Sequence, residues 1–542
     1  MKSVVLAFVW CCLWAFETKA QNSSPVMPQI KYWGGNAELL VNGKSLLMTA
    51  GELGNSSASS TVYMDPIWPK LKKMNLNTLI APVYWELMEP KESVFSFTLV
   101  DYLIKSAREH QIKLILLWFG TWKNSMSCYA PAWVKTNQTR FPRVQSSEGR
   151  SEEIITPFSE NALKADCDAF AALMQHLKQT DSQQHTVVMM QVENEIGMLP
   201  SPRDHSKPAD AAFGRAVPEK LIAYLSLHRD KLVPEIQKAW EGNGYKKAGN
   251  WEAVFGKSAA TDEMFIAWYF ATYANEVARA GKAVYPLPMY VNAALNAPGK
   301  QPGQYPSGGP LPHLIDVWKA AAPDIDLLSP DFYNPNFKYW NDRYTRPDNA
   351  LLIPEHRFEE GVDAKAFYAI GHYKALGFSP FSIESGKKPE TESLGKCYDI
   401  INQLSGEISK AKKQGLMEGL LLSKAADTVK LEMGDYILTV SHDLTLGWSP
   451  NAKEATWPLT GGIIIALSKD EFYVGGTGLV ISFKPKNQAQ RAGIQSVDEG
   501  HFVNGKWQAG RRLNGDEDHQ GRHLRIPTGE YGIQRIKLYS YE

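Results

Sequence analysis

The chain has 542 residues, more than one hydrophobic core usually supports, so we expect a large domain with a smaller one attached. Its 58 basic and 58 acidic side chains give a formal net charge of zero. This balance provides no summed field for nucleic acid or for an anionic membrane, which excludes both as default partners. Aromatic residues make up 11% of the chain, a share that suits stacking on flat neutral ligands as well as core packing.

The N-terminus has the layout of a cleavable secretory signal. Met1-Lys2 is followed by an apolar stretch from Val4 to Phe16 and then by Thr18-Lys19-Ala20. The apolar stretch is shorter than the roughly 20 residues that a membrane-spanning helix needs. We therefore expect residues 1–20 to be a signal peptide, the mature chain to be exported to the periplasm or the cell exterior, and no membrane anchor.

Up to about residue 400, short apolar runs alternate with helical patterns, which indicates parallel strands joined by crossover helices. Eight such runs, each followed by a helical segment, match a closed (β/α)8 TIM barrel better than an open doubly wound sheet. No G-x-G-x-x-G motif follows the first run, which agrees with a barrel. The expected strands are Leu46–Ala50, Thr78–Tyr84, Leu114–Phe119, Val187–Val192, Pro288–Ala293, Asp326–Phe332, Leu351–Pro354 and Phe378–Ile383.

Residues outside the regular alternation predict a helical insertion, an irregular loop and a second domain. Residues 209–282 have a helical pattern, and the Gly- and Pro-rich stretch Ala294–Pro312 predicts an irregular loop over one end of the barrel. After about residue 410, short alternating segments separated by Gly, Asn and Asp are typical of an all-β module. We expect the barrel over 21–405 and a β-sandwich-like domain over 410–542, more readily a structural buttress than a carbohydrate-binding module.

Two carboxylates stand where a barrel enzyme carries its reactive groups. The side chains at the carboxyl-terminal ends of the strands line the shaped cavity of such a barrel. The fourth expected strand leads into Glu195 and the seventh into Glu355. Strands four and seven face each other, and retaining cleavage of a glycosidic bond needs two carboxyl groups roughly 5 Å apart. A single carboxylate at a strand end is more often part of a salt bridge than a catalytic group. The two together predict Glu195 as general acid and base and Glu355 as nucleophile.

Other residues near strand ends are candidate sugar contacts. Asn194 can donate a hydrogen bond to the sugar 2-hydroxyl, and Tyr333 can hold Glu355 ionised by donating its phenolic proton. Glu193 is assigned a structural role. Each of the remaining candidates has a structural alternative, in packing or capping, and they are Glu52, Trp85, Trp122, Asn124 and Asn292.

Two motifs resemble those of glycoside hydrolase family 35. Asn77–Pro90 resembles the second-strand signature of that family, and Gln191–Gly197 resembles its fourth-strand signature. The resemblance covers roughly residues 35–400. It implies a retaining β-galactosidase with catalytic glutamates after strands four and seven, which match Glu195 and Glu355. The C-terminal module is similar to the extension found in a bacterial branch of the family.

Two departures from the family pattern bear on the substrate. Glu86 and Met88 stand where the family has Asn and His before the Glu-Pro of the second strand. The third strand continues into Gly120-Thr121-Trp122-Lys123-Asn124, where the family has Ala-Glu-Trp-Asn. Thr121 cannot make the charge-assisted contact that the family's Glu makes with galactose. The preference for galactose is therefore implied by the resemblance alone.

The expected function is that of a retaining, exo-acting β-galactosidase. It would remove terminal non-reducing β-D-galactosyl residues from oligo- or polysaccharides, with plant cell-wall side chains as one candidate source. We expect a carbohydrate as the only partner and no metal or organic cofactor, while the oligomeric state stays open. Two alternatives remain: another retaining β-glycosidase, acting on β-glucosides or β-arabinosides, and a carbohydrate-binding barrel that does not hydrolyse. The presence of both glutamates favours an enzyme.

Overall fold

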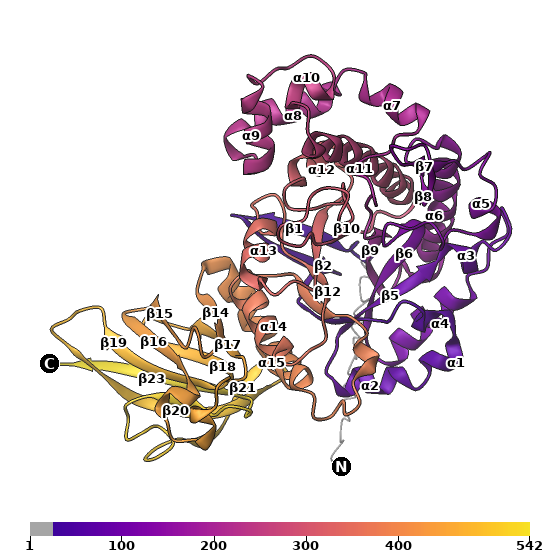
Figure 1. The fold of residues 1–542 in the computed structure, drawn as a ribbon. Coiled ribbons are helices and arrows are strands. Elements are labelled where there is room, and N and C mark those ends of the chain that lie inside the picture. The colour runs from indigo at the N-terminus through magenta and orange to yellow at the C-terminus, as the bar shows by residue number, and fades with distance from the viewer. Residues whose placement is uncertain (1–24) are drawn as a thin grey trace, which may run out of the picture.

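A computed structural model describes residues 25–542, so the predicted signal peptide lies outside the described residues. The centre of the molecule is a closed barrel of eight parallel strands, which confirms the predicted (β/α)8 fold (Figure 1). Neighbouring strands pair in chain order, and the last strand closes on the first. The barrel strands are β4 (Met48–Glu52), β5 (Thr78–Tyr84), β6 (Lys113–Lys123), β9 (Val187–Asn194), β10 (Met289–Ala294), β11 (Leu327–Phe332), β12 (Ile353–His356) and β13 (Gly377–Pro380).

The barrel strands are apolar along their length because both of their faces are covered, one by the barrel interior and one by helices. In β5 all seven residues are buried. The covering helices bury one stripe each: in α4, Val100, Leu103, Ile104 and Ala107 are buried at helical spacing. The helices that follow the strands in turn are α2 (Ile67–Lys73), α4 (Thr98–Glu109), α6 (Glu160–Asp181), α11 (Ala259–Val284), α12 (Ile315–Ala321), α13 (Phe337–Tyr344), α14 (Val362–Gly371) and α15 (Ser393–Gln414).

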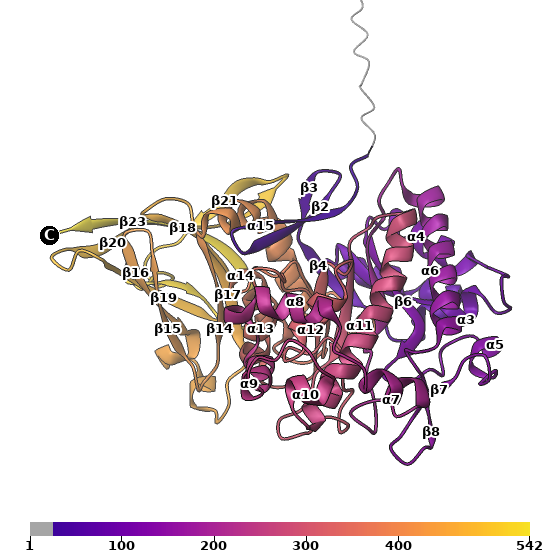
Figure 2. The same cartoon turned by 90° about the horizontal axis from the view of Figure 1, so that it is seen from above.

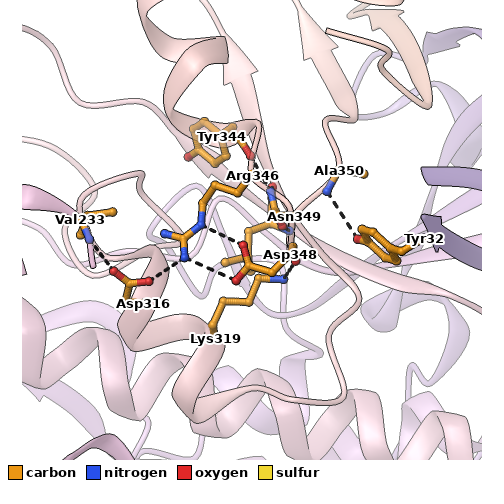
Figure 3. A network of polar contacts seen from close by, with 10 residues as sticks. Tyr32, Val233, Asp316, Lys319, Tyr344, Arg346, Asp348, Asn349 and Ala350 are labelled. Carbon is orange, nitrogen blue, oxygen red and sulfur yellow. Dashed lines mark hydrogen bonds and ion pairs between the residues drawn. The ribbon is translucent and has the colours of Figure 1, made fainter. Parts of the chain in front are cut away.

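The predicted helical insertion between the fourth and fifth strands is present and lies on one side of the barrel (Figure 1). Its helices before α11 are α7 (Lys207–Phe213), α8 (Glu219–Leu227), α9 (Pro234–Gly242) and α10 (Trp251–Phe255). A polar network ties α9 to the barrel (Figure 3): the N–H of Val233 donates to Asp316 in α12 at 2.7 Å, and Arg346 donates to the same carboxylate at 2.9 Å. The Asp316 side chain is fully buried, so these donors offset its desolvation and hold the insertion in place.

The predicted irregular loop also lies at the end of the barrel where the strands finish. Residues 295–314 contain no helix or strand. Met198 and Ser307 exchange backbone hydrogen bonds of 2.7 and 3.1 Å, so this loop packs on the segment that follows Glu195. At Gly197 an added Cβ would lie 2.5 Å from a Pro306 carbon, which shows how closely the two segments approach.

The C-terminal module consists of two antiparallel sheets that share one apolar core, as expected for a sandwich. In β17, Ile464 faces that core, while Ile463 and Ile465 belong to the core of the barrel. The second face packs on α14 and α15, which lie between the barrel and the module (Figures 1 and 2). The six-stranded sheet is β14 (Met417–Leu422), β17 (Thr460–Ala466), β18 (Glu471–Thr477), β23 (Gly532–Tyr541), β20 (Arg491–Val503) and β21 (Lys506–Arg512), and the four-stranded sheet is β15 (Thr428–Met433), β16 (Tyr436–His442), β19 (Leu479–Pro485) and β22 (Leu524–Ile526).

Smaller elements complete the molecule. A three-stranded sheet leads directly into β4 and so lies at the amino-terminal end of the barrel. None of the helices within residues 25–542 has the length and apolar character needed to span a membrane. Within the same residues, all three cysteines are unpaired. The smaller strands and helices are β1 (Gln29–Trp33), β2 (Asn36–Val41), β3 (Lys44–Leu46), β7 (Arg143–Gln145), β8 (Ser151–Ile155), α1 (Thr61–Met64), α3 (Trp85–Met88) and α5 (Ala132–Lys135).

Candidate active site

Four carboxyl groups meet at the carboxyl-terminal end of the barrel. They belong to Glu52 at the end of β4, Glu195 directly after β9, Asp331 in β11 and Glu355 in β12, and all four residues are buried. One oxygen from each of Glu195, Asp331 and Glu355 lies within 4.8 Å of the other two. The barrel therefore brings together two glutamates that are far apart in the sequence.

Asn292 in β10 organises the groups around Glu195. Its Oδ1 accepts a hydrogen bond from the Glu195 N–H at 2.9 Å, and its Nδ2 donates to Asp331 Oδ2 at 2.6 Å and to Asn194 Oδ1 at 3.0 Å. Asn194 Nδ2 in turn donates to Asn124 Oδ1 at 3.1 Å. Glu195 has φ 46°, a left-handed conformation that is costly for a residue with a side chain. The Asn292 contact helps to hold it there.

The predicted contact between Tyr333 and Glu355 is present, with the phenol donating to Oε1. Burial and, after it, the charge of Glu195 raise the pKa of Glu355 to about 8, and the Tyr333 hydrogen bond acts in the opposite direction. Burial also raises the pKa of Glu195. Two carboxyl groups this close share a proton near neutral pH. The Tyr333 hydrogen bond stabilises negative charge on Glu355, the protonation state that a nucleophile needs.

Lys123, the last residue of β6, is the cation of the site. Burial lowers the pKa of its ammonium group, and the nearby charges of Glu195, Glu355 and Glu52 oppose that change. Its Nζ lies 4.8 Å from the centre of the Phe119 ring, inside the distance of a cation–π contact. Burial, followed by the charges of Glu355 and Glu195, raises the pKa of Glu52 well above its usual value. Lys123 therefore compensates part of the negative charge gathered here.

Trp122, a candidate sugar contact in the sequence, has the structural role that was its alternative. Its ring is fully buried outside the barrel, 4.3 Å from the Tyr273 ring of α11, and its Nε1 donates to a backbone carbonyl. The cause is a bulge in β6, where Trp118 pairs with Val192 and Lys123 with Asn194, so that β6 carries extra residues between the two pairs. The bulge breaks the strand alternation and turns Lys123, rather than Trp122, toward the site.

Two neighbours of Trp122 also lie on the outer side of the barrel, and for Glu193 this agrees with the structural role expected from the sequence. Thr121 Oγ1 donates to Asp166 of α6 at 2.6 Å, so Thr121 also points away from the barrel interior. Glu193 lies on this outer side as well, where its Oε2 accepts a hydrogen bond from the Trp122 N–H at 2.7 Å. Gly120 makes room for it, since an added Cβ would lie 2.6 Å from Glu193 Oε1. Because Thr121 points away from the barrel interior, its difference from the Glu of family 35 does not show which groups contact the sugar.

Trp85, another candidate sugar contact, packs in the core instead of lining the site. It begins the short helix α3, is fully buried, and donates from Nε1 to Glu89 Oε2 at 2.7 Å. Its ring packs near those of Trp118 and Trp133, at centroid distances of 6.2 and 5.9 Å. The chain turns into a helix directly after β5, which carries the indole behind the strand instead of over the barrel.

Sequence reasoning missed Asp331 and Lys123. A signal for Asp331 was present, because strand alternation places Asp331 on the same face as Tyr333, two residues later. Lys123 had no such signal, since its orientation depends on the bulge. The carboxylates of Glu195, Asp331 and Glu355 are near enough to share one cation. Protein donors contact two of them, Asn292 at Asp331 Oδ2 and Tyr333 at Glu355 Oε1, while Asp331 Oδ1 has no hydrogen-bond partner among residues 25–542.

Replacing Tyr333 by Phe is expected to lower kcat/KM by about 10- to 100-fold, the usual cost of losing a hydrogen bond to a charged group. Without the phenol the pKa of Glu355 rises, so the acid limb of the pH profile of kcat/KM should move to higher pH. The profile with an aryl glycoside measures both effects. Tyr63→Phe, at an exposed tyrosine, is the control. An unmoved acid limb would contradict this role for Tyr333.

Comparison with known proteins supports the class that the fold and the site indicate. Residues 63–254 match the glycoside hydrolase 42 family model, described as "Beta-galactosidase", and residues 394–525 match DUF5597, a domain of unknown function. No curated protein sequence matches the chain. The closed barrel, the carboxyl groups at its rim and the first of these matches together define the barrel as a glycoside hydrolase domain.

Solved structures similar to this chain include two β-galactosidases and a β-amylase. The β-galactosidase from Bacillus circulans sp. alkalophilus is 14% identical over 67% of this chain and 57% of its own, with a TM-score of 0.45. The β-galactosidase from the psychrophilic Marinomonas ef1 is 12% identical over 67% and 60%, with a TM-score of 0.43. The catalytic domain of the Paenibacillus polymyxa β-amylase is 14% identical over 64% and 94%, with a TM-score of 0.42. This chain thus covers 57% of the length of the first enzyme.

Proposed function

We propose that the protein is a retaining, exo-acting β-galactosidase that removes terminal non-reducing β-D-galactosyl residues from oligo- or polysaccharides. The observation that carries the proposal is that one oxygen of Glu195 and one of Glu355 lie within 4.8 Å of each other, both at the rim of the barrel. Retaining enzymes hold their carboxyl groups about 5 to 5.5 Å apart, whereas inverting enzymes keep roughly 6.5 to 9.5 Å for a water. The family match over residues 63–254 and the motifs resembling family 35 support galactose as the sugar.

The reaction would proceed in two steps. Protonated Glu195 gives its proton to the glycosidic oxygen while ionised Glu355 attacks the anomeric carbon, which releases the leaving group and forms a covalent galactosyl-enzyme. Glu195, now ionised, then takes a proton from water, and the resulting attack on the same carbon frees Glu355. Asn194 donates to the 2-hydroxyl, and the Tyr333 hydrogen bond stabilises the negative charge of Glu355 when it attacks.

A second specificity within the retaining β-glycosidases is favoured by one observation. Lys123 points into the site, and Thr121 of the same segment points away from it. An ammonium group there can donate to hydroxyls placed differently from those of galactose, so β-glucosides or β-arabinosides are the alternative substrates.

The test is a panel of 4-nitrophenyl β-glycosides, namely galactoside, glucoside, arabinoside and mannoside, given to the purified mature chain. We expect the galactoside to be cleaved fastest, with the β-anomer of galactose as the first product in proton NMR. The α-anomer as first product would exclude retention, and faster cleavage of another glycoside would shift the assignment to that sugar. Cleavage of no member would favour a binding protein.

Export and the natural source of the substrate complete the proposal. The layout of residues 1–20 supports secretion to the periplasm or beyond. An exported β-galactosidase would meet polymers outside the cell, for which galactose side chains of plant cell walls are the candidate source.

A further inference from the structure

A cavity of about 510 Å³ opens at the rim of the barrel, on the side of the helical insertion. Its walls are α9, the start of α11, α13 and residues 296–302 of the irregular loop. We call it the side cavity. Its volume lies within the range of about 300 to 1,000 Å³ that is typical of small-molecule sites.

The side cavity begins a few residues along the chain from the candidate active site. Asn336, which lines it, follows three residues after Tyr333, and Asn296, which also lines it, follows four residues after Asn292. Because an extended chain advances at most about 3.6 Å per residue, the cavity begins within roughly 15 Å of these two residues of the site. A chain of a few linked sugars can span that distance from the cleaved bond.

The lining combines exposed aromatic surface with polar atoms that lack partners. Tyr339 is 52% exposed, and its ring meets the Trp340 ring edge to face at 5.1 Å. Trp340 is 4% exposed, and neither its Nε1 nor Asn296 Oδ1 has a hydrogen-bond partner among residues 25–542. Buried polar atoms normally have partners, so these two, in residues that line the cavity, are free to bond a ligand or an ordered water. A sugar offers both hydroxyls and an apolar ring face.

The charged groups of the side cavity are mostly paired, which favours a neutral ligand. Arg343 Nη2 lies 2.7 Å from Glu235 Oε1, and His313 Nε2 lies 2.9 Å from Glu263 Oε2. Lys300 is the exposed exception. The network in Figure 3 fixes the start of α9, so this wall is in place before a ligand arrives.

We propose that the side cavity binds sugar units on the leaving-group side of the cleaved bond, so that the preferred substrate is a galactoside carried on a neutral oligosaccharide. This inference rests on the proposed function for its place in the reaction. Short aryl galactosides do not reach the side cavity, whereas extended substrates gain contacts with Tyr339 and Asn296.

The test compares 4-nitrophenyl β-galactoside with neutral tetrasaccharides that end in β-galactose and continue with galactose, glucose or xylose units. For Tyr339→Ala we expect kcat/KM to fall about tenfold on the preferred tetrasaccharide and to stay within about twofold on the aryl galactoside. Asn296→Ala should show the same selectivity. Tyr541→Ala, an exposed tyrosine of the C-terminal module, is the matched control. Equal effects on both substrates, or none on either, would overturn the inference.

A wild-type enzyme that cleaves no galactoside would contradict the proposed function, and the side cavity is then tested by binding alone. Isothermal titration of the full chain with galactotetraose, cellotetraose and xylotetraose should show binding of at least one, weakened about tenfold by Tyr339→Ala. Absence of binding by all three, or binding that the variant leaves unchanged, would overturn the inference. Thermal unfolding confirms that each variant is folded.

Discussion

Glu355→Ala is expected to lower kcat on 4-nitrophenyl β-galactoside by about 10⁴-fold or more. The residue forms the covalent bond to the anomeric carbon, so its removal abolishes the first chemical step. Its removal also takes one carboxyl group from a cluster of four buried ones, which lessens the repulsion within the cluster, so the variant should remain folded. Initial rates and thermal unfolding, measured on the same preparation, separate loss of chemistry from loss of structure.

The matched control is Glu360→Ala, which removes an exposed carboxylate five residues further along the chain. It should keep the full rate. A folded Glu355→Ala variant with more than a tenth of the wild-type kcat would show that Glu355 is not the nucleophile.

Glu195→Ala is expected to affect the two steps differently. With a good leaving group such as 4-nitrophenolate, the first step needs little protonation and should persist, so a burst of product precedes a stall at the galactosyl-enzyme. With a sugar as leaving group, kcat/KM should fall by about 10²- to 10⁴-fold, the usual contribution of a positioned acid. Stopped-flow absorbance and sugar release measure the two cases.

Azide provides the decisive check on Glu195. It needs no general base, so it should restore turnover of the variant and yield β-galactosyl azide, while leaving the wild type and Glu360→Ala unchanged. The variant should also lose the alkaline limb of the pH profile of kcat/KM. That limb reports loss of the Glu195 proton as pH rises through its raised pKa. Rescue that yields the α-azide would instead indicate that Glu195 is the nucleophile.

Sequence reasoning worked best where a residue's position follows from the regular pattern of a strand. The eight strands could be predicted because each is buried on two faces and therefore reads as a short apolar run. The boundaries of the domains remain predictions, and the predicted barrel limit at residue 405 falls inside α15. Glu195 and Glu355 could be placed at the rim because they end such runs in a closed barrel.

Reasoning failed where the backbone departs from that pattern. Regular strand alternation would direct the Trp122 side chain toward the site. The bulge in β6 directs the Lys123 side chain there instead. Trp85 was predicted to lie at the barrel rim because the strand pattern does not indicate that the chain turns into α3 directly after β5.

By itself, then, the amino-acid sequence determined the barrel, the all-β module and the position of two glutamates at the barrel rim, because strand burial and alternation are local properties of a short stretch of residues. Only the tertiary structure decided that Asp331 and Lys123 join those glutamates and that α9, α13 and the irregular loop enclose the side cavity. Those features depend on contacts between segments that are remote in the chain. The burial of a group, the interaction between charges and the shape of a cavity arise only when these segments pack together.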